Sequence, residues 1–120
     1  MGDPIVHFEI RSTDPRAGRE FYRDLFGWNF IVAPAEHVEG YTYIDSESDR
    51  ATIHGGLSNP QGGSPMVTVY AEVDDIEVAL AKAVELGGSI VQEPTEVPGV
   101  TIGLFADPQG NVVGVAQPRR

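Results

Sequence analysis

Apolar and polar side chains follow the same order in the two halves of the chain. Residues 5–11 alternate, with Val6, Phe8 and Ile10 on one face, which is the pattern of a half-buried β-strand. Residues 67–73 alternate in the same way, and each run is followed by an aspartate, an amphipathic stretch and a glycine. The offset is about 60 residues, and repetition at such a period predicts a duplicated supersecondary unit.

The two helices are marked by their end residues and by apolar spacing. Asp14-Pro15 predicts the start of the first helix, and Gly27 lies where that helix is expected to end. Asp74-Asp75 and Gly87-Gly88 mark the second helix in the same way. Apolar residues recur at helical spacing in both, and in the first helix they are Ala17, Phe21, Leu25 and Phe26.

Shorter apolar runs complete each half as strands. They lie at residues 28–32, 41–45, 51–57, 89–92, 101–106 and 111–117. Each half is therefore expected to be a β-α-β-β-β module within one domain, residues 1–120. The first module covers about 4–57, a Gly- and Pro-rich linker covers 58–65, and the second module covers about 66–118. The predicted class is α+β, with a mixed sheet curved into a cup and the helices outside.

Composition narrows the possible functions. The chain has 120 residues, of which 41% are hydrophobic, enough for a core in one domain. It has no cysteine, which excludes disulfides and thiolate metal sites, and its formal net charge is −10, which argues against a nucleic-acid partner. No apolar run is long enough for a membrane span, and residues 1–8 do not resemble a secretory signal. We therefore expect a cytoplasmic protein.

The face of each first strand that points away from the helix carries the candidate chemistry. Side chains on that face, together with those of the last strand of each module, are expected to line the cup. Repeat alignment makes Gly114 the counterpart of His54. The expected lining residues are His7, Glu9, Arg11 and His54 in the first half, and Thr68, Tyr70, Glu72 and Gly114 in the second.

Two histidines and a carboxylate on neighbouring strands are a candidate metal site with an open coordination position. His7 and His54 are the candidate ligands, with zinc, nickel, iron or manganese as the candidate ions. Glu9 and Glu72 are candidates for the third ligand or for a catalytic base. The alternative interpretation is that both histidines are ordinary hydrogen-bonded side chains.

Other residues of this face also have structural interpretations. Glu9 and Arg11 fit an exposed ion pair, worth about 0–1 kcal/mol. Tyr70 fits a packed ring with its hydroxyl at a wet edge. Gly55-Gly56 fits a bulge or a close backbone approach, because no helix start follows it. Arg11, Thr68, Tyr70 and Gly114 are retained as candidate ligand-binding residues.

Several strings in the chain resemble the vicinal oxygen chelate superfamily, which includes glyoxalase I, bleomycin resistance proteins, fosfomycin resistance enzymes and extradiol dioxygenases. The resemblance covers nearly the whole chain and looks most like short bacterial glyoxalase/bleomycin resistance proteins. The strings are His7-Phe8-Glu9-Ile10, Arg19-Glu20-Phe21-Tyr22, Phe26-Gly27-Trp28, Val69-Tyr70-Ala71-Glu72-Val73-Asp74-Asp75, Glu85-Leu86-Gly87-Gly88 and Asp107-Pro108-Gln109-Gly110-Asn111.

Metal-using members of that family take four ligands from strands, two in each module. Carried onto this chain, the positions are His7, His54, Thr68 and Gly114; the first two match in residue type and the last two do not. The resemblance therefore implies a glyoxalase/bleomycin resistance-like protein that binds a small molecule and has an incomplete set of metal ligands. It also implies a homodimer. The alternative is a divalent-metal-dependent lyase, isomerase or dioxygenase that acts on a small oxygenated substrate.

Overall fold

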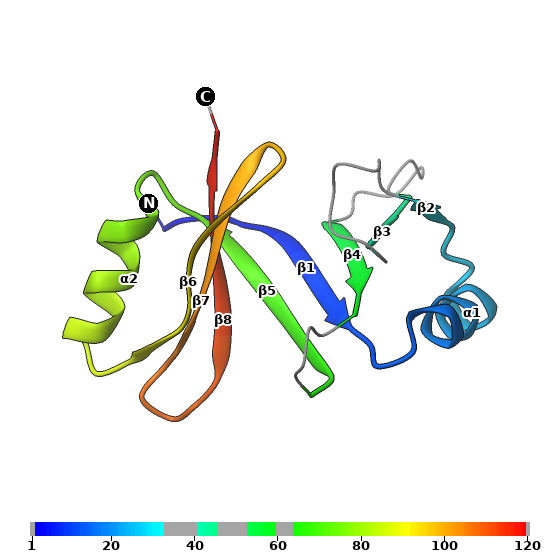
Figure 1. Ribbon diagram of the computed structural model, residues 1–120, viewed down its shortest axis with the longest axis horizontal. Helices are drawn as coiled ribbons and strands as arrows, with labels where there is room; N and C mark the ends of the chain where they lie inside the picture. Colours follow the sequence, from blue (N-terminus) through cyan, green and yellow to red (C-terminus); the bar gives the residue numbers. More distant parts are fainter. Residues whose placement is uncertain (1, 33–40, 46–52, 60–63, 120) are drawn as a thin grey trace. The chain divides into compact units, whose positions relative to one another are not determined.

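The computed structural model describes residues 2–32, 41–45, 53–59 and 64–119 (Figure 1). The order β-α-β-β-β occurs twice, which confirms the predicted α+β class and the two tandem modules. The elements are β1 (Ile5–Arg11), α1 (Pro15–Phe26), β2 (Phe30–Val32), β3 (Thr42–Ile44), β4 (His54–Ser58), β5 (Met66–Glu72), α2 (Ile76–Glu85), β6 (Ser89–Val97), β7 (Val100–Ala106) and β8 (Val112–Pro118).

The chain forms two compact units. One is His7–Val67, and the other joins Met1–Val6 to Thr68–Arg120. The strand order is β2-β3-β4-β1 in the first module and β5-β8-β7-β6 in the second. In each module the first and last strands are parallel neighbours, β1 with β4 and β5 with β8, while the other pairs are antiparallel. The expected cup between the modules stays a prediction.

The first helix begins and ends where the sequence predicts. The Asp14 carboxylate accepts a hydrogen bond from the Ala17 amide at 3.1 Å, which satisfies a free donor of the first turn. Gly27 adopts a left-handed conformation with φ of 74° and donates its N–H to the Arg23 carbonyl at 2.8 Å. A residue with a Cβ is strained in that conformation, so the glycine ends the helix at little cost.

The apolar stripe of α1 differs from the expectation, because no residue of this helix is buried. Phe21, Leu25 and Phe26 are 60%, 58% and 57% exposed. The helix contacts β4, where Gly18 approaches Leu57. Aromatic contacts lie at the C-terminal end of the helix. The centroid of the Trp28 ring is 4.9 Å from that of Phe26 and 5.9 Å from that of Phe8. The neighbouring strands β2 and β3 are three residues long and offer α1 little surface.

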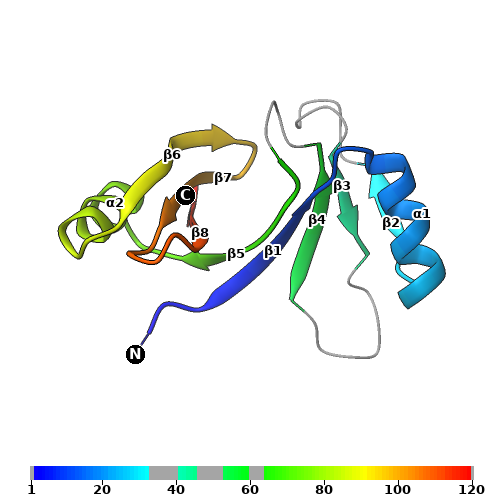
Figure 2. The ribbon, with the colours of Figure 1, turned by 90° about the horizontal axis from the view of Figure 1, so that it is seen from below.

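The second module has a conventional core under α2. Val73, Ile76, Leu80 and Val115 form a buried apolar cluster, and α2 contacts β6, β7 and β8. Figure 2 shows α2 beside these strands from a second direction. Asp75 caps the helix by accepting hydrogen bonds from the amides of residues 77 and 78.

The longest strand, β6, extends beyond the four residues expected. It continues to Val97, and its register against β7 shifts between Ile90 and Gln92 and again between Gln92 and Thr95. Such irregularities admit a proline within an edge strand. A reverse turn forms at Asp107–Gly110, with the Gly110 amide donating to the Asp107 carbonyl at 2.9 Å. Hydrogen bonds from the Asn111 side chain and then from backbone amides hold the pKa of Asp107 below its usual value.

Within the described ranges, neither helix has the length and apolar character that crossing a bilayer requires. The helices contain 12 and 10 residues.

Candidate functional site

A buried carboxylate is the centre of the polar cluster in the first module. Glu9 is 7% exposed, and its Oε1 atom accepts a hydrogen bond from the Tyr41 hydroxyl at 2.9 Å. Its Oε2 atom accepts one from the Ser58 hydroxyl at 3.0 Å. The His7 Nε2 atom lies 3.0 Å from Oε1. We call Glu9, His7, Tyr41 and Ser58 the Glu9 cluster. Its hydrogen bonds offset the cost of removing a carboxylate from water.

The roles of the His7 Nε2 contacts depend on the tautomer of the imidazole ring. The Tyr41 hydroxyl donates its one hydrogen to Glu9, so it can only accept from His7, whose Nε2 lies 3.1 Å away. Glu9 Oε1 is also an acceptor. In the tautomer that carries its proton on Nε2, this atom donates to both acceptors, and the lone pair of the ring is then on Nδ1.

A glycine makes room for the tyrosine of this cluster. A Cβ atom at residue 56 would collide with the hydroxyl and ring of Tyr41. Gly56 lies opposite Glu9 in the β1–β4 register, so its bare backbone lets Tyr41 reach the carboxylate. The Tyr41 ring also contacts that of Tyr43 edge-on, with centroids 5.0 Å apart. Burial raises the pKa of Tyr43, and the charge of Glu9 raises it further.

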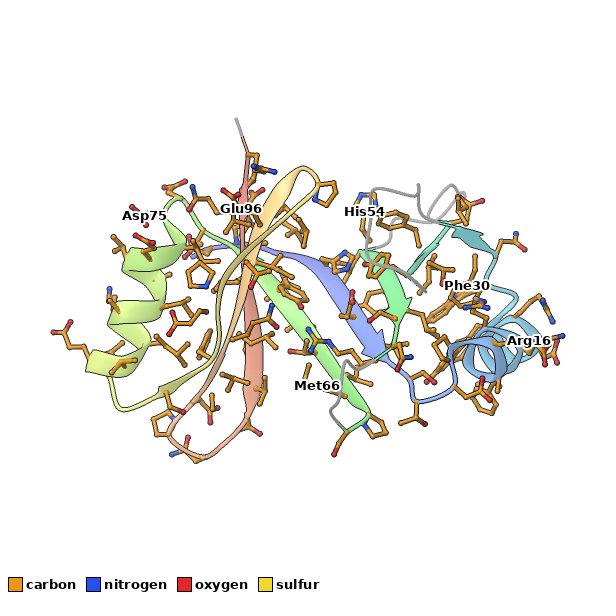
Figure 3. The ribbon with its side chains drawn as sticks, in the orientation of Figure 1. Arg16, Phe30, His54, Met66, Asp75 and Glu96 are labelled. Carbon is orange, nitrogen blue, oxygen red and sulfur yellow. The ribbon has the colours of Figure 1, made fainter. Side chains whose placement is uncertain are left out.

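The two histidines lie on neighbouring strands. His7 and His54 are partners in the parallel β1–β4 register, and Figure 3 labels His54 at the start of β4. His54 is exposed, whereas His7 is half-buried. Figures 1 and 2 both show β4 beside β1. The register thus brings two imidazoles together, but only His7 belongs to the Glu9 cluster.

The strand registers shift the alignment of β4 with β8, the last strands of the two modules, by two residues from the alignment expected from the sequence repeat. Glu9 is opposite Gly56 in the first module, and Tyr70 is opposite Gly114 in the second. Because Glu9 and Tyr70 are equivalent by the repeat, Gly114 corresponds to Gly56. Val112 therefore corresponds to His54. The earlier pairing of His54 with Gly114 relied on sequence alternation, which does not reveal a two-residue offset between parallel strands.

The candidate residues of the second module have structural partners of their own. The Thr68 hydroxyl is buried and donates to the Val112 carbonyl at 2.9 Å. The Tyr70 ring is also buried and lies against Gly114, where a Cβ would collide with it. The half-buried Glu72 donates its backbone N–H to the Pro4 carbonyl at 2.9 Å. Their role in ligand binding or catalysis stays a prediction.

Arg11 lies at the end of β1, where it is half-buried and opposite Ser58 in the strand register. Ser58 itself donates to Glu9. Arg11 therefore lies directly opposite a member of the Glu9 cluster, and its role in ligand binding also stays a prediction.

The donor set does not suit the divalent metal that the fold family implies. Thr68 uses its hydroxyl on a backbone carbonyl, and neither Gly114 nor Val112 has a side chain that can ligate. The His7 Nε2 atom lies against Glu9 Oε1, and the two Glu9 oxygens accept hydrogen bonds from the Tyr41 and Ser58 hydroxyls. Among the described residues, no three His, Cys, Asp or Glu side chains are grouped as metal ligands would be.

Sequence reasoning missed two members of the Glu9 cluster. Ser58 was assigned to the linker, although it continues the alternation of His54 and Gly56 by one step and belongs to β4. Extending that alternation would have found it. Tyr41 comes from outside the β1–β4 pair, just before β3. No spacing rule in the sequence predicts that it reaches Glu9.

The tandem modules and the polar face of β1 define a protein of the vicinal oxygen chelate type. A sequence model of the Glyoxalase/Bleomycin resistance protein/Dioxygenase superfamily matches residues 4–115. The chain belongs to this superfamily.

Two of the similar proteins are named as anthracycline biosynthesis proteins. The chain is 33% identical over 123 residues to the anthracycline biosynthesis protein DnrV of Streptomyces peucetius, and 32% identical to DauV of Streptomyces sp. (strain C5). Each match covers 90% of this chain, but the chain spans only 44% of either relative. The crystal structure of methylmalonyl-CoA epimerase from Mycobacterium tuberculosis shares the fold, with a TM-score of 0.64, 15% identity, and coverage of 97% of this chain and 88% of that one.

Proposed function

We propose that this domain binds a small oxygenated, aromatic molecule at the Glu9 cluster and does so without a metal ion. The observation that carries the proposal is the buried Glu9 carboxylate, which holds Tyr41 and His7 by hydrogen bonds of 2.9 and 3.0 Å. His7 and Tyr41 are both half-buried, so part of each is accessible. Fixed polar groups beside an aromatic pair lose little conformational entropy when a ligand binds.

The relatives support the kind of ligand proposed. Two of them are anthracycline biosynthesis proteins, and anthracyclines are oxygen-rich aromatic molecules. The edge-on pair of Tyr41 and Tyr43 supplies an aromatic surface next to the polar cluster. The net charge of −10 favours a ligand that also carries positive charge. We further propose that the protein is a cytoplasmic homodimer.

Calorimetric titration with daunorubicin and with bleomycin tests the proposal. We expect saturable binding of at least one of them, weakened roughly tenfold or more by Glu9→Gln, because a charge-assisted hydrogen bond contributes about 1.5–3 kcal/mol. Gly2→Ala is the control, since nothing lies within 4 Å of a Cβ at that position. Equal affinity of the Glu9→Gln and control proteins would contradict the site.

A second candidate function is a divalent-metal-dependent lyase, isomerase or dioxygenase, with Glu9 or Glu72 as base. The pairing of His7 with His54 in the strand register favours it, although the rest of the donor set does not suit a metal. Titration with zinc, nickel, iron and manganese, followed by elemental analysis, separates the two functions. One equivalent of tightly held metal, lost in the His7→Ala/His54→Ala variant, would replace the metal-free proposal with this one.

A further inference from the structure

An apolar groove lies along α2, within the unit that joins Met1–Val6 to Thr68–Arg120. Its volume is about 600 Å³, within the range of about 300–1,000 Å³ that is typical of pockets for small organic molecules. One wall is a row of α2 residues four positions apart, Val78, Lys82 and Leu86. Because α2 has 10 residues and a helix rises about 1.5 Å per residue, the groove has room for an elongated molecule of about 15 Å.

The floor of this α2 groove is the edge of the hydrophobic core. Val73 and Val115 belong to the buried cluster under α2 and also line the groove. Phe105 packs against that cluster and lines the groove as well. On the wall, Val78 and Leu86 are 62% and 69% exposed. A molecule in the groove would therefore cover exposed apolar side chains and rest on packed ones, which is typical of a ligand site.

The start of the α2 groove is strongly acidic. Asp74 and Asp75 come directly before α2, and both line the groove. Figure 3 labels Asp75 at the start of the helix. Asp3 lies at the same end, because the Glu72 amide donates to the carbonyl of the neighbouring Pro4 at 2.9 Å. Three carboxylates outweigh the positive end of the helix dipole, which is equivalent to about half an elementary charge.

The opposite end of the groove has less net charge. Asp107 lies there, since a Cβ at Gly87 would be 3.5 Å from the side chain of Pro108. Its carboxylate oxygens already accept hydrogen bonds within their own turn. Lys82 is one helical turn before Leu86, so the formal charges of Asp107 and Lys82 cancel. The groove therefore has a direction: it favours a cationic group at the three-carboxylate end and an apolar body beyond it.

We propose that the α2 groove binds a small amphiphilic cation, an organic ammonium ion with a linear apolar chain. The ammonium lies among the three aspartates, and the chain runs along Val78 toward Leu86. Exposed ion pairs are individually weak, so burial of the chain supplies most of the affinity and the carboxylates select the sign of the charge. The groove and the Glu9 cluster belong to different units, so this site is separate from the one proposed above.

Decylammonium chloride is the probe, at concentrations below those at which it forms micelles. In nuclear magnetic resonance titrations of the full chain we expect saturable amide shifts, concentrated at α2, β7 and β8. The melting temperature should rise, because a ligand that binds only the folded state stabilises it. Hexylammonium should bind about tenfold or more weakly, because each of the four lost methylenes is worth about twofold in a half-open groove. Decanoate, with the opposite charge, should bind at least as weakly as hexylammonium.

Two charge variants locate the ammonium. Asp3→Asn/Asp74→Asn should weaken decylammonium binding by about fivefold, as expected for the loss of two exposed ion pairs. Glu85→Gln/Glu93→Gln is the matched control, because both residues are exposed acids of the same unit that do not line the groove. The control removes the same number of charges, and its affinity should stay within about twofold of the natural protein, since salt screens charges outside the site.

A second pair of variants tests the apolar wall. Val78→Ser should weaken decylammonium binding by about threefold, because apolar surface of the site is lost. Val91→Ser is its control and should bind as the natural chain does, since Val91 is an exposed valine of the same unit outside the groove. Circular dichroism shows that each variant is folded.

The proposal fails if decanoate binds as tightly as decylammonium, or if Asp3→Asn/Asp74→Asn and its control have equal affinity. A melting temperature that falls as decylammonium is added would also overturn it, because the amine would then favour the unfolded chain. Amide shifts centred on the Glu9 cluster would assign the amine to the other unit and would overturn the groove site. The function proposed for the Glu9 cluster is tested by a different variant, Glu9→Gln, so the two proposals fail separately.

Discussion

The buried Glu9 carboxylate has three polar partners, two at Oε1 and one at Oε2. Tyr41 and His7 contact Oε1, and Ser58 contacts Oε2. Removing one partner of this buried carboxylate leaves a polar atom without a hydrogen bond. That costs more free energy than losing a contact at the surface. The cluster therefore couples the stability of the first module to the groups proposed to bind ligand.

Gly56 gives the most direct test of this coupling. We expect Gly56→Ala to lower the free energy of unfolding by about 1–3 kcal/mol, because a methyl group there overlaps Tyr41 and displaces it from Glu9. Urea denaturation measures the loss. Gly2→Ala, which meets nothing within 4 Å, should leave stability unchanged. An unchanged midpoint in Gly56→Ala would refute the close approach.

Tyr43 reports the charge of Glu9. Burial is the larger cause of its raised pKa, and Glu9 is the second. We therefore expect Glu9→Gln to lower the pKa of Tyr43 part of the way toward 10.0, as measured by absorbance of the tyrosinate. No movement would mean that residue 9 is neutral or distant.

The raised pKa of Tyr43 also makes the stability of the folded state depend on pH. The folded state holds the phenolic proton more tightly than the unfolded state does, so the associated stability is fully present below pH 10.0. It is lost as the pH rises through the raised value. The Glu9→Gln protein should lose less stability than the natural protein over that alkaline range.

At the scale of elements, the helix ends follow from neighbouring residues alone. Asp14, Gly27 and Asp75 each act within a few positions of where they stand, so the sequence was sufficient to predict them. The exposure of the apolar side chains of α1 was not predictable in this way. The helix has the predicted apolar stripe, but burial of that stripe depends on strands that are distant in the sequence. The strands β2 and β3 are too short to cover it.

Asp75 carries the prediction for α2. It accepts hydrogen bonds from the amides of Glu77 and Val78 at 3.0 and 3.1 Å. We expect Asp75→Ala to destabilise the protein by about 0.5–2 kcal/mol in urea denaturation, and Asp75→Asn to retain most of the stability, because the amide oxygen still accepts. Equal losses in both variants would point to the charge rather than the cap.

At the scale of the whole molecule, duplication explains both what the sequence revealed and what it concealed. The repeat predicted two modules of the same order, and that prediction is confirmed. The repeat also suggested that His54 and Gly114 are equivalent. The observed registers instead equate Gly56 with Gly114. An alternating pattern repeats every two residues, so it cannot distinguish registers that differ by two.

The overall charge leads to a prediction for the whole chain. With 18 acidic and 8 basic side chains, self-repulsion opposes the compact state. We expect the melting temperature to rise as sodium chloride is raised from about 10 mM to about 150 mM, because salt screens exposed charges. Scanning calorimetry measures this. A lower melting temperature in salt would show that attractive ion pairs outweigh the repulsion.

The aromatic contacts at the end of α1 have an optical consequence. Trp28 is the sole tryptophan, and its indole lies 4.9 Å from the ring of Phe26 and 5.6 Å from that of Tyr22. The wavelength of its fluorescence maximum therefore depends on the surroundings of this helix end, and no added fluorophore is needed. Dilution of the natural chain should shift the fluorescence maximum of Trp28 if a neighbouring molecule shields the helix. Otherwise the maximum should stay constant.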